Sequence, residues 1–356
     1  MLLLDGLHLP LTTPFYSDGR LNVSKLEHNV ARYSKTPIAG LVALGNSAES
    51  TLLSEEETRR VLRGVVGAAA EEKVLIAGVS RDSVVGTLDL AGWAAEFGYD
   101  AVLVKRPSII RVGARGEFAK ELLTYFQSVA DRSPLPVVLW SDALENGAAL
   151  PAEMVVELAG HPMILGIVDG LSDLVRSERL KVGTSGVKRD VTVTPVFAAV
   201  TRRMQTQRAQ TGAGGLISAA TLTDGGAVVG VAPTKIVART RTKVVGFQIL
   251  AGRAERMLEG LKAGAVGAMP GFAAAAPQAC YEVLAAWKDG DEGLAREKQD
   301  RLADVAKRVE GEMGVAGIKF GCDLNGYFGG RPRLPLLPPN GTEQAEIAEL
   351  LRSMPN

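Results

Sequence analysis

Amide and hydroxyl side chains follow two apolar runs of this 356-residue chain, at positions where they could bind a small polar molecule. Asn46 and Ser47 come directly after the run 39–45, and Thr12 and Thr13 lie near the end of the run 7–15. In α/β proteins, the groups that bind ligands and perform chemistry gather where buried strands end. The pattern predicts a site in which Thr12, Thr13, Asn46 and Ser47 hydrogen-bond a ligand.

Expected strands and helices alternate along most of the chain. Ser54 followed by Glu57 forms a capping-box pattern, which predicts a helix from Glu55. Short Val-, Ile- and Leu-rich runs separated by helical segments indicate a parallel sheet covered by helices. The eight expected strands are 7–15, 39–45, 74–80, 101–105, 136–140, 164–169, 247–251 and 265–269. Eight strand–helix units favour a closed α/β barrel of the (β/α)₈ TIM type over an open sheet, and no Gly-x-Gly-x-x-Gly turn follows the first strand to suggest a dinucleotide.

A long insertion, at about 184–244, interrupts this alternation between strands six and seven. It contains an expected helix at 196–207 and short candidate strands at 227–231 and 236–237. Such a segment could pack on the surface or in an oligomer contact, cover the barrel mouth, or be disordered. It follows the helix after strand six, so we expect it on the N-terminal side of the barrel, which favours packing or assembly. We divide the chain into a barrel at 1–275 that carries this insertion and a C-terminal helical region at 276–356.

Composition and charge limit the class of protein. The chain is 46% hydrophobic and 22% charged, as is usual for a soluble globular protein, and its formal net charge is zero. We therefore expect no nucleic-acid partner. No apolar run reaches the roughly 18 residues of a membrane span, and no signal peptide is recognisable, so we expect a cytoplasmic protein that does not enter a membrane. Cys280 and Cys322 are expected to be reduced core thiols, and the three histidines lack metal-ligand spacing, so we predict neither a metal nor a cofactor.

Several motifs match one family of enzymes. Residues 45–50 read Gly-Asn-Ser-Ala-Glu-Ser, and Leu-Ser-Glu-Glu follows at 53–56. Thr-Thr-Pro-Phe occupies 12–15, and Gly-Ile-Val-Asp occupies 166–169. Together with the runs 76–79, 136–139, 264–268, 318–319 and 333–336, these motifs resemble the dihydrodipicolinate synthase / N-acetylneuraminate lyase family of class I aldolases. The resemblance implies a TIM barrel that acts on a small oxo acid, and a homo-oligomer, either a tetramer or a dimer.

The same resemblance shows which chemical groups have been replaced. Val168 stands where the family carries the lysine that forms a Schiff base with an α-keto acid, and a valine side chain has no lone pair for this reaction. Trp140 stands in place of a tyrosine that relays protons; its indole N–H donates but cannot shuttle a proton. Ile109 and Glu145 fall near the positions of a second tyrosine and of a carboxylate-binding arginine. The ordinary pyruvate aldolase reaction is therefore not implied, although Trp140 and Val168 are expected at the ligand site.

Three residues at strand ends are candidates for replacement chemistry. Lys105, after strand four, could supply an amine from a new position, or it could simply cap its strand on the outside. Asp142 and Asp169 could act as acid and base without a covalent intermediate. Asp169 could equally be structural, and so could Glu49. The carboxylates of Asp142, Asp169 and Glu49 could also offer oxygen ligands to a hard cation, although we predict no metal site.

Two functions remain open at this point. The first is a divergent lyase, or a related enzyme, that acts on a small oxo or hydroxy acid without the usual lysine. The second is a catalytically silent barrel that binds a metabolite or acts through assembly, because a fold does not fix an activity.

Overall fold

The structure is a computed structural model that describes residues 1–110, 119–142, 149–171, 173–206, 240–352 and 354. The expected strands 227–231 and 236–237, together with Glu145, lie outside the described residues.

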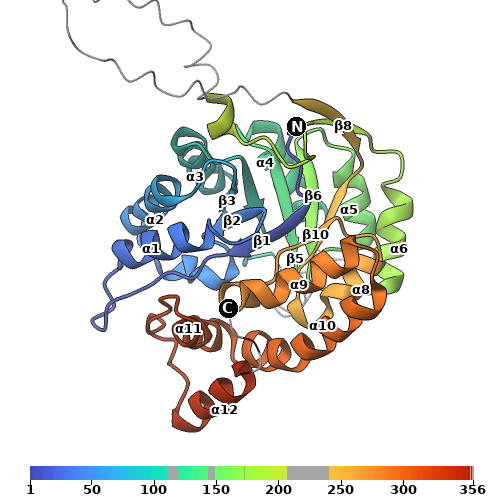
Figure 1. Ribbon diagram of the computed structural model, residues 1–356. Helices are drawn as coiled ribbons and strands as arrows, with labels where there is room; N and C mark the ends of the chain where they lie inside the picture. The colour runs from blue at the N-terminus through green and yellow to red at the C-terminus, as the bar shows by residue number, and fades with distance from the viewer. Residues whose placement is uncertain (111–118, 143–148, 172, 207–239, 353, 355–356) are drawn as a thin grey trace, which may run out of the picture.

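A closed barrel of parallel strands forms the centre of the molecule (Figure 1). Its strands are β1 (Gly6–Pro10), β2 (Gly40–Ala43), β3 (Val74–Gly78), β4 (Ala101–Val104), β5 (Val137–Ser141), β6 (Ile164–Asp169), β9 (Gln248–Ala251) and β10 (Gly267–Ala268). They follow one another around the barrel in chain order, and β10 pairs with β1 to close it. All eight overlap the segments that the sequence predicted, with β1 starting one residue earlier and β5 ending one residue later, since each is a largely apolar run with both faces buried. The predicted (β/α)₈ barrel is confirmed.

Helices connect the strands and cover the outside of the barrel (Figure 1). They are α1 (Val23–Tyr33), α2 (Glu55–Ala68), α3 (Val84–Phe97), α4 (Ala119–Arg132), α5 (Ala152–Ala159), α6 (Leu174–Gly183) and α8 (Met257–Lys262). Polar caps fix where several of them begin. The capping box at α2 is present, since Ser54 Oγ accepts from the N–H of Glu57 and Glu57 Oε2 accepts from the N–H of Ser54. The side chains of Ser83 and Asp173 cap the starts of α3 and α6 by accepting hydrogen bonds from backbone N–H groups of the first turn.

Side chains alternate between the barrel axis and the helical layer along each strand. On β5, Val138 and Trp140 belong to an interior cluster, whereas Val137 and Leu139 pack against the helices. The interior cluster also contains Val42, Ile76, Leu103, Val168, Leu250 and Met269. Val168 pairs with Trp140 on one side and with Leu250 on the other, and it is fully buried. The barrel axis is therefore filled by apolar side chains at this level.

The described parts of the insertion lie at the N-terminal end of the barrel. Strands β7 (Arg189–Val193) and β8 (Arg241–Val245) form a separate antiparallel pair. Val191 and Val193 pack with Leu3, and the amino group of Met1 donates to the carbonyl of Asp190. Figure 1 shows β8 and the N-terminus at the end of the barrel opposite α11 and α12. The described part of the insertion therefore packs on the side of the barrel away from its mouth. The expected helix at 196–207 begins at Arg202 instead, because the Thr201 hydroxyl caps it by accepting from Met204 N–H.

The C-terminal region folds onto the opposite end, beside the turns that leave the strands. It comprises α9 (Pro277–Lys288), α10 (Glu292–Ala306), a π-helical segment (Lys307–Glu312), α11 (Gly314–Leu324) and α12 (Gly341–Leu351). Helix α11 contacts the short 3₁₀ turns Asn46–Ala48 and Gly271–Ala274, which follow β2 and β10. This part of the chain therefore forms one wall of the barrel mouth.

Candidate functional site

A small cavity of about 200 Å³ lies at the C-terminal mouth of the barrel. The strand ends contribute Pro10, Asn46, Ser47, Trp140, Asp142, Gly252, Arg253 and Gly271, and the C-terminal region contributes Glu310, Gly311, Gly314, Val315 and Ile318. Its volume is below the ~300–1,000 Å³ usual for pockets that hold drug-sized ligands, so it suits a ligand of only a few heavy atoms. Of the sequence-predicted residues, the structure brings Asn46, Ser47, Trp140 and Asp142 together here.

Asp142 and Arg253 form a buried ion pair in the cavity wall. Arg253 Nη2 lies 2.8 Å from Asp142 Oδ2, and the two side chains are 10% and 5% exposed. Both residues follow strand ends, Asp142 after β5 and Arg253 after β9. Gly170 permits the aspartate to lie here, because a Cβ at this position would approach the Asp142 carboxyl carbon to 2.7 Å. A guanidinium held in this way offers further N–H donors in a fixed plane, as carboxylate recognition requires.

Glu310 brings a second carboxyl group to the cavity from the π-helical segment. Its Oε1 accepts from the N–H of Gly271 at 2.7 Å, and its Oε2 accepts from the N–H of Ala254 at 3.4 Å. These two backbone donors belong to the turns after β10 and β9, so the carboxyl group joins the C-terminal region to the strand ends. Burial raises the pKa of Glu310 to about 7, although Arg253 and the backbone N–H groups act in the opposite direction. A carboxyl group with such a pKa exchanges protons readily at neutral pH.

Trp140 presents a donor that is not used. Its side chain is 7% exposed, and among the residues that the structure describes its indole Nε1 has no hydrogen-bond partner. An unpaired buried N–H costs free energy, about 1–3 kcal/mol, and such groups often mark positions where a ligand or water binds. The ring lies directly above the apolar barrel interior, beside Val168 on the neighbouring strand.

The turn after β2 has a strained backbone that aims its side chains toward the mouth. Leu44 and Glu49 have positive φ values of 56° and 52°, which residues other than glycine rarely adopt. Glu49 turns back toward the C-terminal region, where its Oε1 lies 2.6 Å from Lys319 Nζ and its Oε2 accepts from the N–H of Arg333 at 2.7 Å. Thr13 supports the same turn by donating to the carbonyl of Ala48 at 2.7 Å. These contacts hold the segment that carries Asn46 and Ser47.

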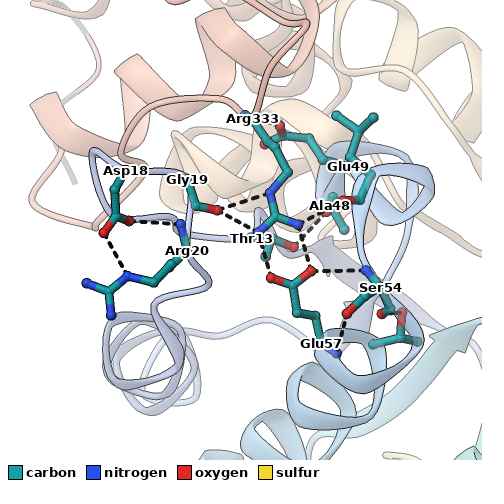
Figure 2. Close-up of polar contacts among 11 residues, drawn as sticks. Thr13, Asp18, Gly19, Arg20, Ala48, Glu49, Ser54, Glu57 and Arg333 are labelled. Carbon is teal, nitrogen blue, oxygen red and sulfur yellow. Dashed lines mark hydrogen bonds and ion pairs between the residues drawn. The ribbon is translucent and has the colours of Figure 1, made fainter.

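Arg333 fixes the outer side of this turn (Figure 2). Its Nη1 and Nη2 donate to the two carboxylate oxygens of Glu57 at 2.7 and 2.6 Å, a two-bond geometry that fits an arginine. It also donates to the carbonyls of Gly19 and Leu52. The guanidinium holds the pKa of Glu57 down, to about 2. Arg333 therefore joins the C-terminal tail to the turns after β1 and β2.

The other predicted site residues lie outside the cavity lining. Asp169 is on the helix-facing side of β6 and forms an ion pair with Arg176, whose Nε lies 3.1 Å from Oδ2. The backbone N–H of half-buried Lys105 donates to Ser80 Oγ. Thr12 and Thr13 are both buried, and Val168 lies in the interior below Trp140.

Two buried lysines occur in the described part of the chain, and neither belongs to the barrel interior. Lys73 donates to the carbonyls of Thr36 and Ile38 at 2.9 Å each, and Lys319 pairs with Glu49. Within the described ranges, no three His, Cys, Asp or Glu side chains come together as a metal site would require. The helices that the structure describes include none long and apolar enough to cross a membrane.

Sequence reasoning missed Arg253 and Glu310. Arg253 carried the same signal as Asp142, because each is a charged residue two positions after the end of a predicted strand. Glu310 carried no such signal, since its position at the mouth depends on how the C-terminal region folds back.

The fold and this site define a class: a parallel (β/α)₈ barrel with a small polar cavity where its strands end, the position that enzymes of this architecture use. The model of the dihydrodipicolinate synthetase family matches residues 3–232 and 222–354, so the chain belongs to this family. A 4-hydroxy-tetrahydrodipicolinate synthase of Methanothrix thermoacetophila is 26% identical over 349 residues, which cover 98% of this chain and 96% of that protein. Among solved structures, a dihydrodipicolinate synthase from Bacillus anthracis has a TM-score of 0.76 at 20% identity, with full coverage of both chains. YagE, a family member from E. coli K12 solved in complex with pyruvate, has a TM-score of 0.73 at 21% identity and 99% coverage of both chains.

Proposed function

We propose that this protein is an enzyme that acts on a small oxo or hydroxy acid in the mouth cavity, by proton transfer and without an imine to a lysine of β6. One observation carries the proposal: Arg253, Asp142 and Glu310 line one small cavity at the mouth, while the fully buried residue next to Trp140 on β6 is Val168. An arginine suits the carboxylate of an oxo acid, and a carboxyl group that titrates near neutrality suits proton transfer.

Pyruvate is the first ligand to test, because the related YagE was solved in complex with it. The cavity volume of about 200 Å³ accommodates a molecule of this size. The orphan indole N–H of Trp140 supplies a donor for an oxygen of the ligand. Like most proteins with this barrel architecture, the chain would bind its substrate at the strand ends rather than on its sides.

Borohydride reduction tests the absence of an imine. The protein is incubated with pyruvate and a panel of larger oxo acids, reduced, and weighed by intact-protein mass spectrometry. We expect no covalent adduct. An adduct that disappears in Lys105→Ala would instead assign imine chemistry to Lys105, and an adduct that persists would place it on another lysine.

Ligand binding and turnover test the remaining part of the proposal. A thermal-shift panel of oxo and hydroxy acids should raise the melting temperature of the wild type, and Arg253→Met should abolish the shift. Arg179→Met is the matched control, since Arg179 lies on α6 with a side chain 66% exposed. Turnover of a binding acid, followed by NMR, would establish an enzyme.

A catalytically silent metabolite-binding barrel is the second candidate. It is favoured by the engagement of both predicted acids, since Asp142 is paired with Arg253 and Asp169 with Arg176. Binding of an acid without turnover or solvent-proton exchange would support this function.

A further inference from the structure

We propose that Glu310 is the proton-exchanging group of the mouth cavity: it takes up one proton when an α-oxo acid anion binds beside Arg253, and it then donates that proton in a hydrogen bond to the ligand. This inference rests on the ligand class of the proposed function and adds the residue and the proton stoichiometry.

The charges that line the cavity make the uptake favourable. Asp142 and Arg253 neutralise each other through their ion pair, which leaves Glu310 as the unbalanced charge of the lining residues. A monoanionic ligand would place a second negative charge within the same small volume. Like charges this close favour protonation of one of them, as in paired carboxylates of other active sites. Protonation of Glu310 removes the repulsion and turns an acceptor into a donor.

The geometry leaves room for that proton. The carboxylate of Glu310 accepts backbone N–H groups from Gly271, Ala254 and Phe272, whereas a carboxylate has about four lone-pair sites. About one site therefore remains, and a proton bound there points the O–H at the ligand. These backbone bonds also fix the orientation of the group, as an acid or base in a site requires. The π-helical segment that carries it is a rare conformation that is frequent at functional sites.

Few other titratable groups face Glu310. Arg253 lines the same cavity and favours the ionised form of Glu310, while burial favours the neutral form. Glu255 on the turn Ala254–Arg256 and the Cys280 thiol on α9 are nearby; the pKa of that thiol is raised well above its ordinary value, mainly by burial, so it is neutral near pH 7. Lys319 on α11 is engaged by Glu49. On its own segment, Arg308 pairs with Glu312 and Glu346.

Calorimetry in two buffers measures the proton directly. Pyruvate is titrated into the wild type at pH 7.5 in phosphate and in Tris, whose ionisation enthalpies differ. Because binding takes up most of one proton, we expect the binding enthalpies to differ by most of the difference between the ionisation enthalpies of the two buffers. The affinity should fall up to about tenfold per pH unit above pH 7. Glu310→Gln should bind with no proton uptake and with an affinity that does not depend on pH between 6 and 9.

Glu312→Gln is the matched control. Glu312 belongs to the same segment but is 50% exposed, so its removal should leave the proton uptake of the wild type unchanged. Equal binding enthalpies in the two buffers for the wild type would overturn the assignment of Glu310 while leaving ligand binding intact.

A measurement without ligand separates this inference from the proposed function. The ¹³C carboxyl resonance of Glu310, assigned by its loss in Glu310→Gln, is followed through a pH titration of the free protein. A midpoint near neutrality supports the proposal, and a midpoint near the ordinary value of 4.5 overturns it, even if none of the tested acids binds.

Discussion

The amino group of Lys319 lies 2.6 Å from Oε1 of Glu49, and the two side chains are 0% and 1% exposed. The pair joins α11 of the C-terminal region to the strained turn after β2, across 270 residues of sequence. Lys319 also donates to the carbonyl of Arg331 at 3.0 Å and lies 4.5 Å from the ring centroid of Phe15. The lysine is therefore fully engaged in holding the mouth together rather than free to act as a nucleophile.

Removing the charge of Lys319 should strongly destabilise the protein. Lys319→Met leaves Glu49 buried without its ionic partner, which should reduce the free energy of unfolding by about 3–5 kcal/mol in a urea titration. Lys298→Met is the control, because Lys298 pairs with Glu282 at a site that is 22% and 34% exposed, and its loss should cost no more than about 1 kcal/mol. Equal losses of unfolding free energy in the two variants would show that the buried pair stabilises the protein no more than an exposed ion pair does.

The stabilising contribution of Glu57 should be lost in acid. Arg333 lowers the pKa of Glu57 in the folded protein to about 2 from an ordinary value of 4.5. Its contribution to stability is therefore complete above about pH 4.5 and is lost as the pH falls through about 2. Between these limits, the wild type should lose about 2 kcal/mol more than Glu57→Gln, measured by urea unfolding. Glu56→Gln, on the exposed side of the same turn, should follow the wild type.

Arg176 should be essential for stability, unlike its neighbour on the same helix. Its side chain is 11% exposed, and its guanidinium balances the carboxylate of Asp169, whose pKa burial raises despite this partner. Arg176→Met should cost about 3–5 kcal/mol of unfolding free energy, because Asp169 would be left buried without a counter-charge. Arg179→Met, which removes a 3.6 Å pair with Glu153 at the surface, should cost less than about 0.5 kcal/mol. If Asp169 binds a ligand instead of stabilising α6, the two variants will have similar stability.

The barrel could be predicted from the sequence because its strands are short apolar runs with both faces buried, and this pattern is local. Helix α11 lies within the C-terminal region that was expected to be helical, although Gly317 and Gly321 weaken its helical propensity. A Cβ at these positions would lie 2.7 Å from the Val309 carbonyl and 2.9 Å from the Ala275 side chain, so close packing requires them.

Part of the candidate site could likewise be predicted. Asn46, Ser47, Trp140 and Asp142 follow or end strands, and strand ends converge in any parallel barrel. Glu310 and Lys319 reach the mouth only because the C-terminal region folds back onto the barrel: Glu310 contacts a turn 56 residues earlier and Lys319 pairs with a residue 270 positions earlier, which no local pattern encodes. The helix-facing position of Asp169 follows from its alternation with Val168, so this distinction was within reach of the sequence.

An amine placed at Val168 should restore covalent chemistry if the ligand carbonyl reaches this level of the barrel. Val168 is fully buried beside Trp140, so a lysine here would have a lowered pKa and a free amine. Val168→Lys should cost about 3 kcal/mol of stability and should yield an adduct with pyruvate on borohydride reduction. Val168→Met, which has no amine, should yield none. A folded Val168→Lys protein that gives no adduct would mean that pyruvate binds elsewhere.

Trp140→Phe should separate ligand binding from stability. The indole Nε1 has no hydrogen-bond partner within the described part of the chain, so its removal eliminates an unsatisfied donor. The free energy of unfolding should therefore stay within about 1 kcal/mol of the wild type, whereas affinity for an oxo acid that accepts from the indole should fall about 5- to 10-fold. Trp93→Phe provides the control, because Trp93 lies on α3 under the guanidinium of Arg59 and away from the cavity lining. An unchanged affinity in Trp140→Phe, measured by calorimetry, would show that the ligand does not use this donor.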